Sequence, residues 1–325
     1  MVRGVELVRG LSNLASRRRG AAVSIGNYDG VHRGHQTVLR ELVRRARALK
    51  VPATVVVFEP TPQEFFAPAS PPARLMRFSE KVRTLAEHGV ERIVCLRFNR
   101  HLADMSPETF VERILVNGLG VRYLVVGDDF RFGQGRRGDF TLLQQAGAVH
   151  GFEVQDTGTL LADGERISST RIRQALADGD MEQAAAMLGR PFALGGHVLY
   201  GARLGRKLGF PTANIALHRR TVPVRGIFVA RIGGIDDKPR TGVAYVGSRP
   251  AVGGTYALLE VFVFDFDAEL YGRRLQVELL HRLRDDAHFD SLDALQSQIQ
   301  KDVSAAHRWL QQGENSTVKM ENERG

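Results

Sequence analysis

Short apolar runs alternate with amphipathic segments across residues 21–156, and this alternation restricts the fold more than any other feature. The runs are rich in β-branched residues and read "AAVSIG", "ATVVVFEP", "RIVCLRF", "RYLVVG" and "FEVQDT". One helical pattern follows the first run, and another begins at Ser106 and Pro107. Strands that alternate with helices predict a parallel sheet covered on both faces, with ligands bound beyond the carboxyl ends of its strands. The first helix should bury Val38, Leu39, Leu42, Val43, Ala46 and Leu49.

The pattern changes in the second half of the chain. From Ala193 to Arg284 nearly every segment reads as strand or glycine-punctuated turn, which predicts a small antiparallel sheet or barrel. One amphipathic helix follows, from Ser291 to about Gln311. We therefore predict an α/β domain over residues 1–186, a β domain over 187–312 and an unstructured tail over 313–325. The apolar stripe of the last helix is Leu292, Leu295, Ile299, Val303, Ala306 and Leu310.

Charge and cysteine content limit the function classes. Lys and Arg exceed Asp and Glu by 45 to 36, and the sequence pI is about 10.1, which favours anionic partners such as nucleotides, phosphorylated metabolites or nucleic acid. The positive residues are scattered and are not interleaved with aromatic residues. The single cysteine, Cys95, excludes an internal disulfide, and no apolar run is long enough for a membrane span. We expect a cytoplasmic protein that is monomeric and binds no membrane.

Two histidines, His32 and His35, stand in a glycine-rich turn between the first apolar run and its helix. Gly26, Gly30 and Gly34 would let the backbone approach a ligand, and a helix N-terminus offers free N–H groups to phosphate. Imidazoles there can donate hydrogen bonds to phosphate oxygens. The alternative is a pair of capping or surface histidines. A metal site is less favoured, because no second cluster of ligand residues lies nearby in the sequence.

The stretch "GNYDGVHRGHQ" resembles the G-x-F-D-G-V-H-x-G-H-Q signature of the prokaryotic bifunctional riboflavin kinase/FMN adenylyltransferases, or FAD synthetases. The resemblance continues in order through "FEPTPQEFF", "GDDFRFGQGRRGD", "ISSTRIRQAL", "GRKLGFPTANI", "GVAYVGSRP" and "LEVFVFDFDAELYG". It implies a Rossmann-like nucleotidyltransferase domain followed by a six-stranded antiparallel β-barrel riboflavin kinase domain with a C-terminal helix. It also implies phosphorylation of riboflavin to FMN, then adenylylation of FMN to FAD, with ATP and Mg²⁺. The expected partners are riboflavin, FMN and ATP, and no nucleic acid.

In the first domain the resemblance implies that His32 and His35 are catalytic and hold the ATP phosphates. It extends phosphate binding to Gly26, Asn27, Asp29, Gly34, Ser168, Ser169, Thr170, Arg171 and Arg173. It also implies a nucleotide- and flavin-contacting loop at Gly127, Asp129 and Phe130. For "ISSTRIR" the alternative is a plain serine-threonine helix cap with solvated arginines. The nearby G-x-G-x-x-G match at Gly133 is set aside, because the preceding strand ends several residues earlier.

In the second domain the resemblance implies that Thr212 and Asn214 position Mg²⁺ and that Gly205 and Gly209 let a loop close over ATP. Lys207 is followed by Leu208, so the segment is not a Walker A motif. Glu260 would be the general base that takes the proton from the 5′-hydroxyl of the ribityl chain. The alternatives are a strand edge with turn residues for "PTAN" and an exposed strand-end acid for Glu260.

Four positions depart from the family pattern: Tyr28, Thr61, Ala251 and Phe262. None is a residue with an expected catalytic role. Two other functions remain open at this level. One is an adenylyltransferase for a different phosphorylated acceptor, which would not explain the barrel with "PTAN". The other is a basic nucleic-acid-binding protein, which would explain the charge.

Overall fold

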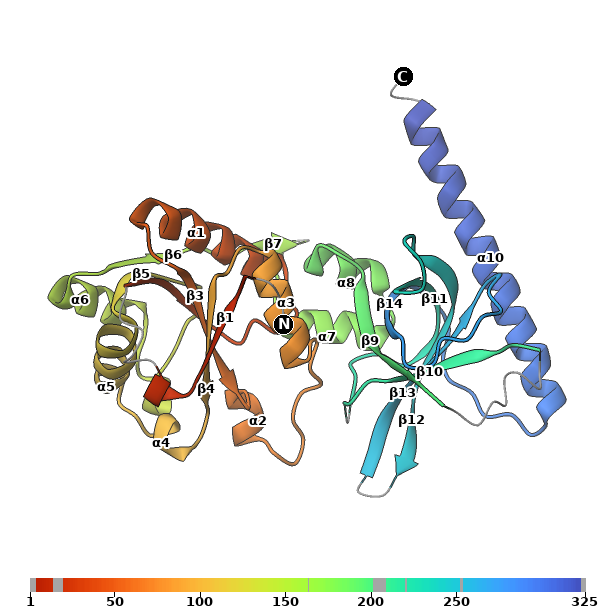
Figure 1. The fold of residues 1–325 in the computed structure, drawn as a ribbon, viewed down its shortest axis with the longest axis horizontal. Helices are drawn as coiled ribbons and strands as arrows, with labels where there is room; N and C mark the ends of the chain where they lie inside the picture. Colours follow the sequence, from red (N-terminus) through yellow and green to blue (C-terminus); the bar gives the residue numbers. More distant parts are fainter. Residues whose placement is uncertain are drawn as a thin grey trace. The chain divides into compact units, whose positions relative to one another are not determined.

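A computed structural model describes residues 4–13, 20–162, 164–200, 209–219, 221–251 and 254–322. The chain divides into two compact units, Met1–Ser169 and Thr170–Gly325 (Figure 1). The predicted boundary after residue 186 lies inside α8 (Met181–Leu188). The prediction therefore assigned nearly all of α7 (Ser169–Asp178) and most of α8 to the other side of the division, and the predicted boundary stays a prediction.

The first unit contains a six-stranded parallel sheet with the order β1-β4-β3-β2-β5-β6. From β2 the chain adds strands first on one side of the sheet and then, with β5, on the other. Ligands of such sheets bind beyond the carboxyl ends of the two strands at this switch point, here β2 and β5. The strands are β1 (Glu6–Arg9), β2 (Ala21–Ile25), β3 (Ala53–Glu59), β4 (Arg92–Arg97), β5 (Val121–Val126) and β6 (Glu153–Asp156). The helices are α1 (Arg33–Leu49), α2 (Pro62–Phe66), α3 (Phe78–Glu87), α4 (Arg100–Ala103), α5 (Pro107–Phe110) and α6 (Phe140–His150), with π-helical η3 (Val111–Leu119) continuing α5.

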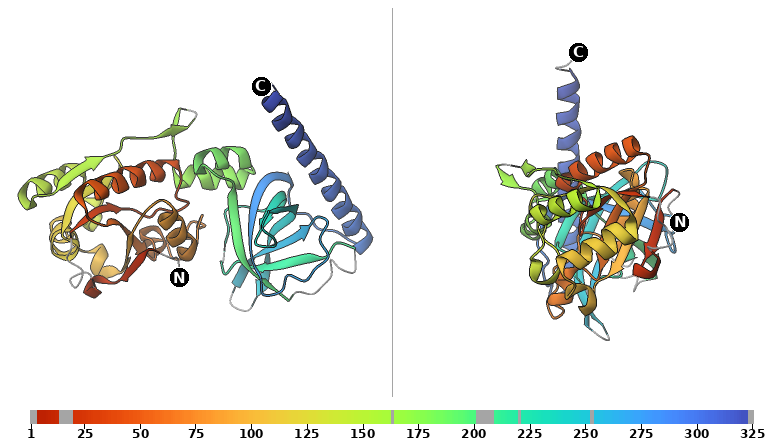
Figure 2. Two further views of the ribbon diagram at one scale, coloured as in Figure 1. Left: turned by 45° about the horizontal axis from the view of Figure 1, so that its top comes forward. Right: turned by 90° about the vertical axis from the view of Figure 1, so that its left-hand side faces the viewer.

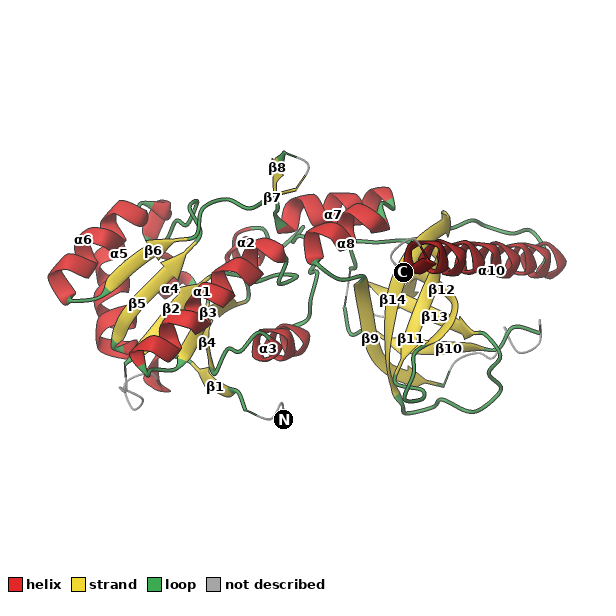
Figure 3. Cartoon of the chain, turned by 90° about the horizontal axis from the view of Figure 1, so that it is seen from above, coloured by secondary structure: helices red, strands yellow, loops and turns green. Residues whose placement is uncertain are grey.

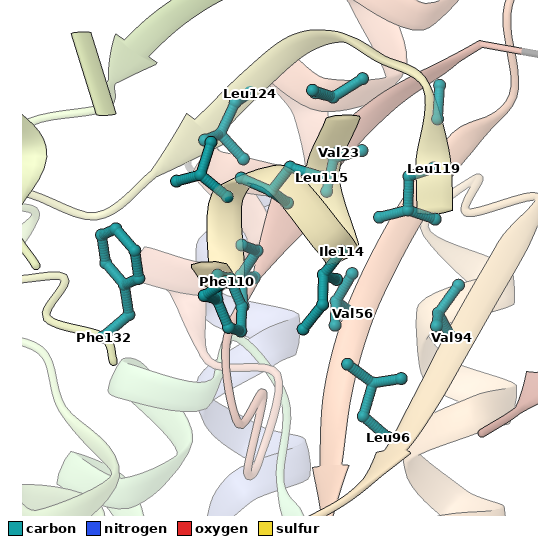
Figure 4. Close-up of a cluster of buried hydrophobic side chains, with 14 of the residues drawn as sticks. Val23, Val56, Val94, Leu96, Phe110, Ile114, Leu115, Leu119, Leu124 and Phe132 are labelled. Carbon is teal, nitrogen blue, oxygen red and sulfur yellow. The ribbon is translucent and has the colours of Figure 1, made fainter. Parts of the chain in front are cut away.

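Helices cover both faces of this sheet, as the sequence predicted (Figure 3). On one face α1 buries Val38, Leu39, Leu42 and Ala46 against β2, β3 and β5. On the other face the α5–η3 segment packs against alternate residues of the central strands (Figure 4). Its contacts include Phe110, Ile114 and Leu115 from the helices and Val23, Val56, Val94 and Leu124 from the strands. Burial on both faces explains why these strands read as continuous apolar runs.

The second unit contains a closed antiparallel barrel of six strands, in the order β10-β13-β12-β11-β14-β9. The strands are β9 (Phe192–Leu199), β10 (Thr212–Ala216), β11 (Gly226–Gly233), β12 (Arg240–Ala251), β13 (Gly254–Val263) and β14 (Arg274–Arg284). Ladder hydrogen bonds close the sheet on itself, so each of these six strands has a neighbour on both sides. The predicted barrel is therefore confirmed.

Helix α10 (Leu292–Asn322) packs against the outside of the barrel (Figure 2). Val303 and Ala306 are buried there with Phe264, while Leu292 at the start of the predicted stripe is exposed. The helix continues past Gln312, whereas the sequence predicted an unstructured tail from residue 313. No proline interrupts this stretch, and adding residues to an existing helix costs far less than starting one.

Within the ranges given above, no helix is both long and apolar enough to cross a membrane.

Candidate active sites

The first candidate site lies where β2 and β5 end, at the reversal of strand order. A pocket of about 230 Å³ opens there between the loop after β2 and the loop after β5. The sequence-predicted residues that line it are Gly26, His32, Gly34, His35, Gly127, Asp129, Phe130, Ser168 and Ser169. Three motifs far apart in the sequence thus face one cavity.

His32 and His35 form a stacked pair at the start of α1. Their ring centroids lie 3.7 Å apart at an interplanar angle of 19°. His32 caps the helix, because its Nδ1 accepts a hydrogen bond from the backbone N–H of His35 at 3.3 Å. An accepting Nδ1 carries no proton, so the neutral His32 ring has its N–H at Nε2. The capping alternative raised by the sequence is therefore correct for His32, and capping coexists with a place in the pocket.

The pocket keeps His35 neutral. Burial lowers the pKa of His35 well below its ordinary value, and the positive charges of Lys81 and Arg166 lower it further. Its Nδ1 atom is inaccessible to solvent and has no hydrogen-bond partner in the described structure. The neutral His35 ring thus lies near the positive side chains of Lys81 and Arg166, and these surroundings favour a negatively charged ligand.

The loop between β2 and α1 is held in a strained form. Tyr28 and Val31 have φ values of +49° and +43°. Residues other than glycine rarely adopt such values, and β-branched residues such as valine do so least of all. The hydroxyl of Tyr28 donates to Ser24 at 2.6 Å, and the hydroxyl of Ser24 donates to the carbonyl of Val125 at 2.7 Å. These bonds tie the loop to β5.

Asp29 anchors a neighbouring segment of backbone. Its two carboxylate oxygens accept hydrogen bonds from the N–H groups of Leu75 and Met76, each at 3.1 Å. Its carbonyl accepts from the hydroxyl of Ser169 at 2.9 Å, which fixes the start of the "ISSTRIR" segment against the histidine loop. Asp29 is thus a support of the site, and it does not line the pocket.

Four other residues that were predicted to bind phosphate in this domain do not line the pocket. Asn27 lies in the loop between β2 and α1 but not among the lining residues. Thr170, Arg171 and Arg173 follow Ser169 in α7 and belong to the second unit. All four stay predictions.

Arg166 lines the pocket and was not singled out from the sequence. Its guanidinium forms ion pairs with Asp128 at 3.0 Å and with Asp129 at 2.6 Å. The hydroxyl of Thr159 donates to Asp128. These contacts join the loop after β5 to the strand pair β7 (Leu161–Ala162) and β8 (Glu165–Arg166). The only sequence signal was the position of Arg166 directly before "ISST".

A half-buried charge network joins Arg74, Glu59, Glu64 and the buried Lys81. Arg74 pairs with Glu59 at 2.7 Å and with Glu64 at 2.5 Å, and hydrogen bonds to Glu64 and Glu59 raise its pKa. Lys81 is 2% exposed, and its ammonium lies 3.9 Å from Glu59. Burial lowers the pKa of Lys81. The charge of Lys81 lowers the pKa of His35, and the charge of Asp29 partly offsets the effect of burial on the pKa of Lys81.

The second candidate site lies on the outer face of the barrel. Asn214 of β10 pairs with Glu260 of β13 in the strand register, and both are half-buried. The neighbours of Glu260 along β13, Leu259 and Val261, are fully buried inside the barrel, so Glu260 faces outward. Thr212, two residues before Asn214, shares that face. It also lines a pocket of about 60 Å³, whose lining includes neither Asn214 nor Glu260.

The glycine loop expected beside this site is described only in part. Gly209 adopts a φ of +84°, and among the described residues no heavy atom lies within 4 Å of the position that a Cβ would take there. Gly205 falls outside the described residues.

A tyrosine that sequence reasoning missed stands beside Glu260. Tyr245 of β12 is the cross-strand partner of Glu260, and its hydroxyl donates to Asp286 at 2.9 Å. Because Asp286 follows β14, no sequence pattern could have placed it next to β12.

Among the described residues no group of three or more His, Cys, Asp or Glu side chains could hold a metal ion. The oxygen atoms of Thr212 and Asn214, on one face of β10, suit Mg²⁺ that keeps most of its ligands as water and phosphate.

The fold and the first site define the class: a nucleotidyltransferase domain with paired histidines at the sheet switch point, joined to a six-stranded β-barrel domain. Family models agree, because one described as FAD synthetase matches residues 14–171 and one described as riboflavin kinase matches residues 188–310. The chain belongs to the bifunctional riboflavin kinase/FMN adenylyltransferase family and carries both activities.

Two curated relatives with this name support the assignment. The one from Escherichia coli (strain K12) is 46% identical and covers 94% of this chain and 98% of its own. The one from Pseudomonas fluorescens is 50% identical and covers 93% and 97%. A crystal structure titled a macrolide-efflux protein from Streptococcus pneumoniae has a TM-score of 0.80 at 29% identity, covering 94% of this chain and 99% of that one.

Proposed function

We propose that each activity has its own site: the histidine pair carries adenylyl transfer, and the outer barrel face around Glu260 carries phosphorylation of riboflavin. The observation that most strongly supports this division is that the histidine pair and Glu260 lie in separate compact units, with the histidine pair at a pocket of the first unit. We further propose that the reactions take place in the cytoplasm.

In adenylyl transfer, a phosphate oxygen of FMN attacks the α-phosphorus of ATP, and the bond to the departing pyrophosphate breaks. The nucleophile is already an anion, so the protein mainly orients the reactants and offsets their charge. His32 would donate from Nε2 to a phosphate oxygen, and the N-terminus of α1 would supply backbone N–H groups. Ser168 would add a hydroxyl donor, while the bond from Ser169 to the carbonyl of Asp29 keeps this segment against the histidine loop.

In riboflavin phosphorylation, Glu260 would take the proton of the ribityl 5′-hydroxyl while that oxygen forms a bond to the γ-phosphorus of ATP, with ADP leaving. Thr212 and Asn214 would hold Mg²⁺, which offsets phosphate charge when bound with ATP. Asn214 is the cross-strand neighbour of Glu260, so acceptor and phosphate would meet on one patch of the barrel.

The test is a time course with purified protein, riboflavin, ATP and Mg²⁺, with the flavins separated by chromatography. We expect FMN to appear first and FAD after it, and chelation of Mg²⁺ to stop both steps. FMN without FAD would contradict the role proposed for the histidine pair. Undiminished turnover after chelation would contradict the role proposed for Mg²⁺.

A further inference from the structure

The imidazole of His35 is in contact with two other rings. The ring of His32 stacks on it with centroids 3.7 Å apart, and the phenol ring of Tyr28 lies 4.8 Å away at a tilt of 40°. All three residues line the pocket of the first unit. The Nδ1 atom of His35 is buried and has no hydrogen-bond partner in the part of the chain that the structure describes. On this edge of the imidazole, packing and not a hydrogen bond therefore sets the orientation.

The ring of Tyr28 is itself held firmly. Its hydroxyl donates to Oγ of Ser24 in β2 at 2.6 Å, and Ser24 donates in turn to the carbonyl of Val125 in β5 at 2.7 Å. A Cβ built at Gly26 would lie 3.2 Å from Cε2 of Tyr28, so the ring packs directly against the backbone of Gly26. Tyr28 is 2% exposed. The phenol thus gives the imidazole of His35 a fixed surface to rest on.

We propose that the aromatic ring of Tyr28 is a positioning element for adenylyl transfer, which holds the imidazole of His35 in place at the pocket. Tyr28 acts through His35. The family signature has phenylalanine at this position, so the ring carries the positioning role, and the hydroxyl, through its bond to Ser24, contributes to stability. This inference rests on the role proposed above for the histidine pair.

Loss of the ring has a specific consequence under this proposal. An aliphatic side chain at position 28 has no flat face, so the imidazole of His35 can tilt, and no hydrogen bond at Nδ1 resists the tilt. A displacement of about 1 Å can lower a rate about a hundredfold. The kinase reaction is proposed for the barrel, which contains neither Tyr28 nor His35, so it serves as an internal control.

The test measures both reactions in variants of the full chain. We expect Tyr28→Leu to lower kcat for FAD formation from supplied FMN about tenfold, and Tyr28→Phe, which keeps the ring, to stay within about threefold of the wild type. Total FMN plus FAD formed from riboflavin should change less than about twofold in both. The matched control is Tyr123→Leu, which removes another buried tyrosine ring of the same unit, outside the pocket. FAD formation per folded chain should be nearly unchanged in this control.

A second measurement follows His35 directly. Its imidazole C–H resonances, assigned by their loss in His35→Gln, should move in Tyr28→Leu, because the ring current of the phenol is lost, and should move much less in Tyr28→Phe. If Tyr28→Leu does not fold, Tyr28→Met takes its place, because a flexible side chain fills the space without a flat ring. Unmoved resonances in the variant without the ring would overturn the inference.

The outcomes separate this inference from the proposed function. FAD formation retained by Tyr28→Leu, a Tyr28→Phe rate as low as that of Tyr28→Leu, an equal fall in riboflavin phosphorylation, or an equal loss in Tyr123→Leu would each overturn the inference. FAD formation retained by His35→Ala would instead overturn the role of the histidine pair, whatever the Tyr28 variants give. Circular dichroism and urea unfolding of each variant give the folded fraction by which its rates are divided.

Discussion

His32 Nδ1 accepts the backbone N–H of His35 at 3.3 Å, and the two imidazole rings stack at 3.7 Å. One histidine therefore caps the helix that carries the other. Helix capping is usually a matter of stability alone, but here it also fixes which nitrogen of His32 bears the proton. Changes near this contact should affect FAD synthesis more than they affect folding.

Gly34→Ala should separate activity from stability. A Cβ at this position would lie 3.2 Å from Nδ1 of His32, so the ring must shift by a few tenths of an ångström. Alanine in place of glycine favours a helix by up to about 1 kcal/mol. We expect unchanged or increased unfolding free energy and an FAD formation rate about tenfold lower, since small displacements of reacting groups are costly. FAD formation from supplied FMN measures the rate, and urea denaturation measures the stability; an unchanged rate would show that the ring position is not important.

Acidification should destabilise the folded chain through His35. The pKa of His35 is lowered in the folded state, so below about pH 6.5 the unfolded chain binds a proton that the folded chain does not. Stability from this group is complete above that value and is lost as the pH falls. From about pH 7.5 to about pH 5.5, the wild-type chain should lose about 1 kcal/mol more unfolding free energy than His35→Gln. Equal losses in the two proteins would contradict a buried neutral His35.

Arg74→Ala should destabilise the chain by about 1–2 kcal/mol, because it leaves the half-buried Glu59 and Glu64 without the guanidinium that bridges them. The matched control is Arg100→Ala, which removes an exposed ion pair with Asp104 and should cost less than about 0.5 kcal/mol. Chemical denaturation of both variants gives the comparison. Similar costs for the two would mean that the half-buried network contributes little to stability.

The sequence predicted local elements well where one residue pattern determined them. The apolar runs became β2 to β6, Ser106 became the N-cap of α5, and the glycine-rich second half became the barrel. Strand β1 was missed, because "ELVR" is too short and too charged to show a period.

The site was predictable only in part, for a physical reason. Motif residues such as His32 and Ser169 carry their chemistry in a local pattern, and the structure places both at one pocket. Asp29 was expected among the phosphate-binding residues, but its carboxylate supports the backbone at Leu75 and Met76. Contacts such as that between Tyr245 and Asp286 join distant strands, so they exist only after the chain has folded.

The measurement that most directly tests two separate sites is a reciprocal assay of His35→Ala and Glu260→Gln. Each variant is given riboflavin with ATP in one reaction and FMN with ATP in the other, and both products are quantified. We predict that His35→Ala forms FMN at nearly the normal rate but no FAD, and that Glu260→Gln forms FAD from FMN but no FMN from riboflavin. Loss of both reactions in either variant, with circular dichroism unchanged, would contradict the division of the two activities between the two domains.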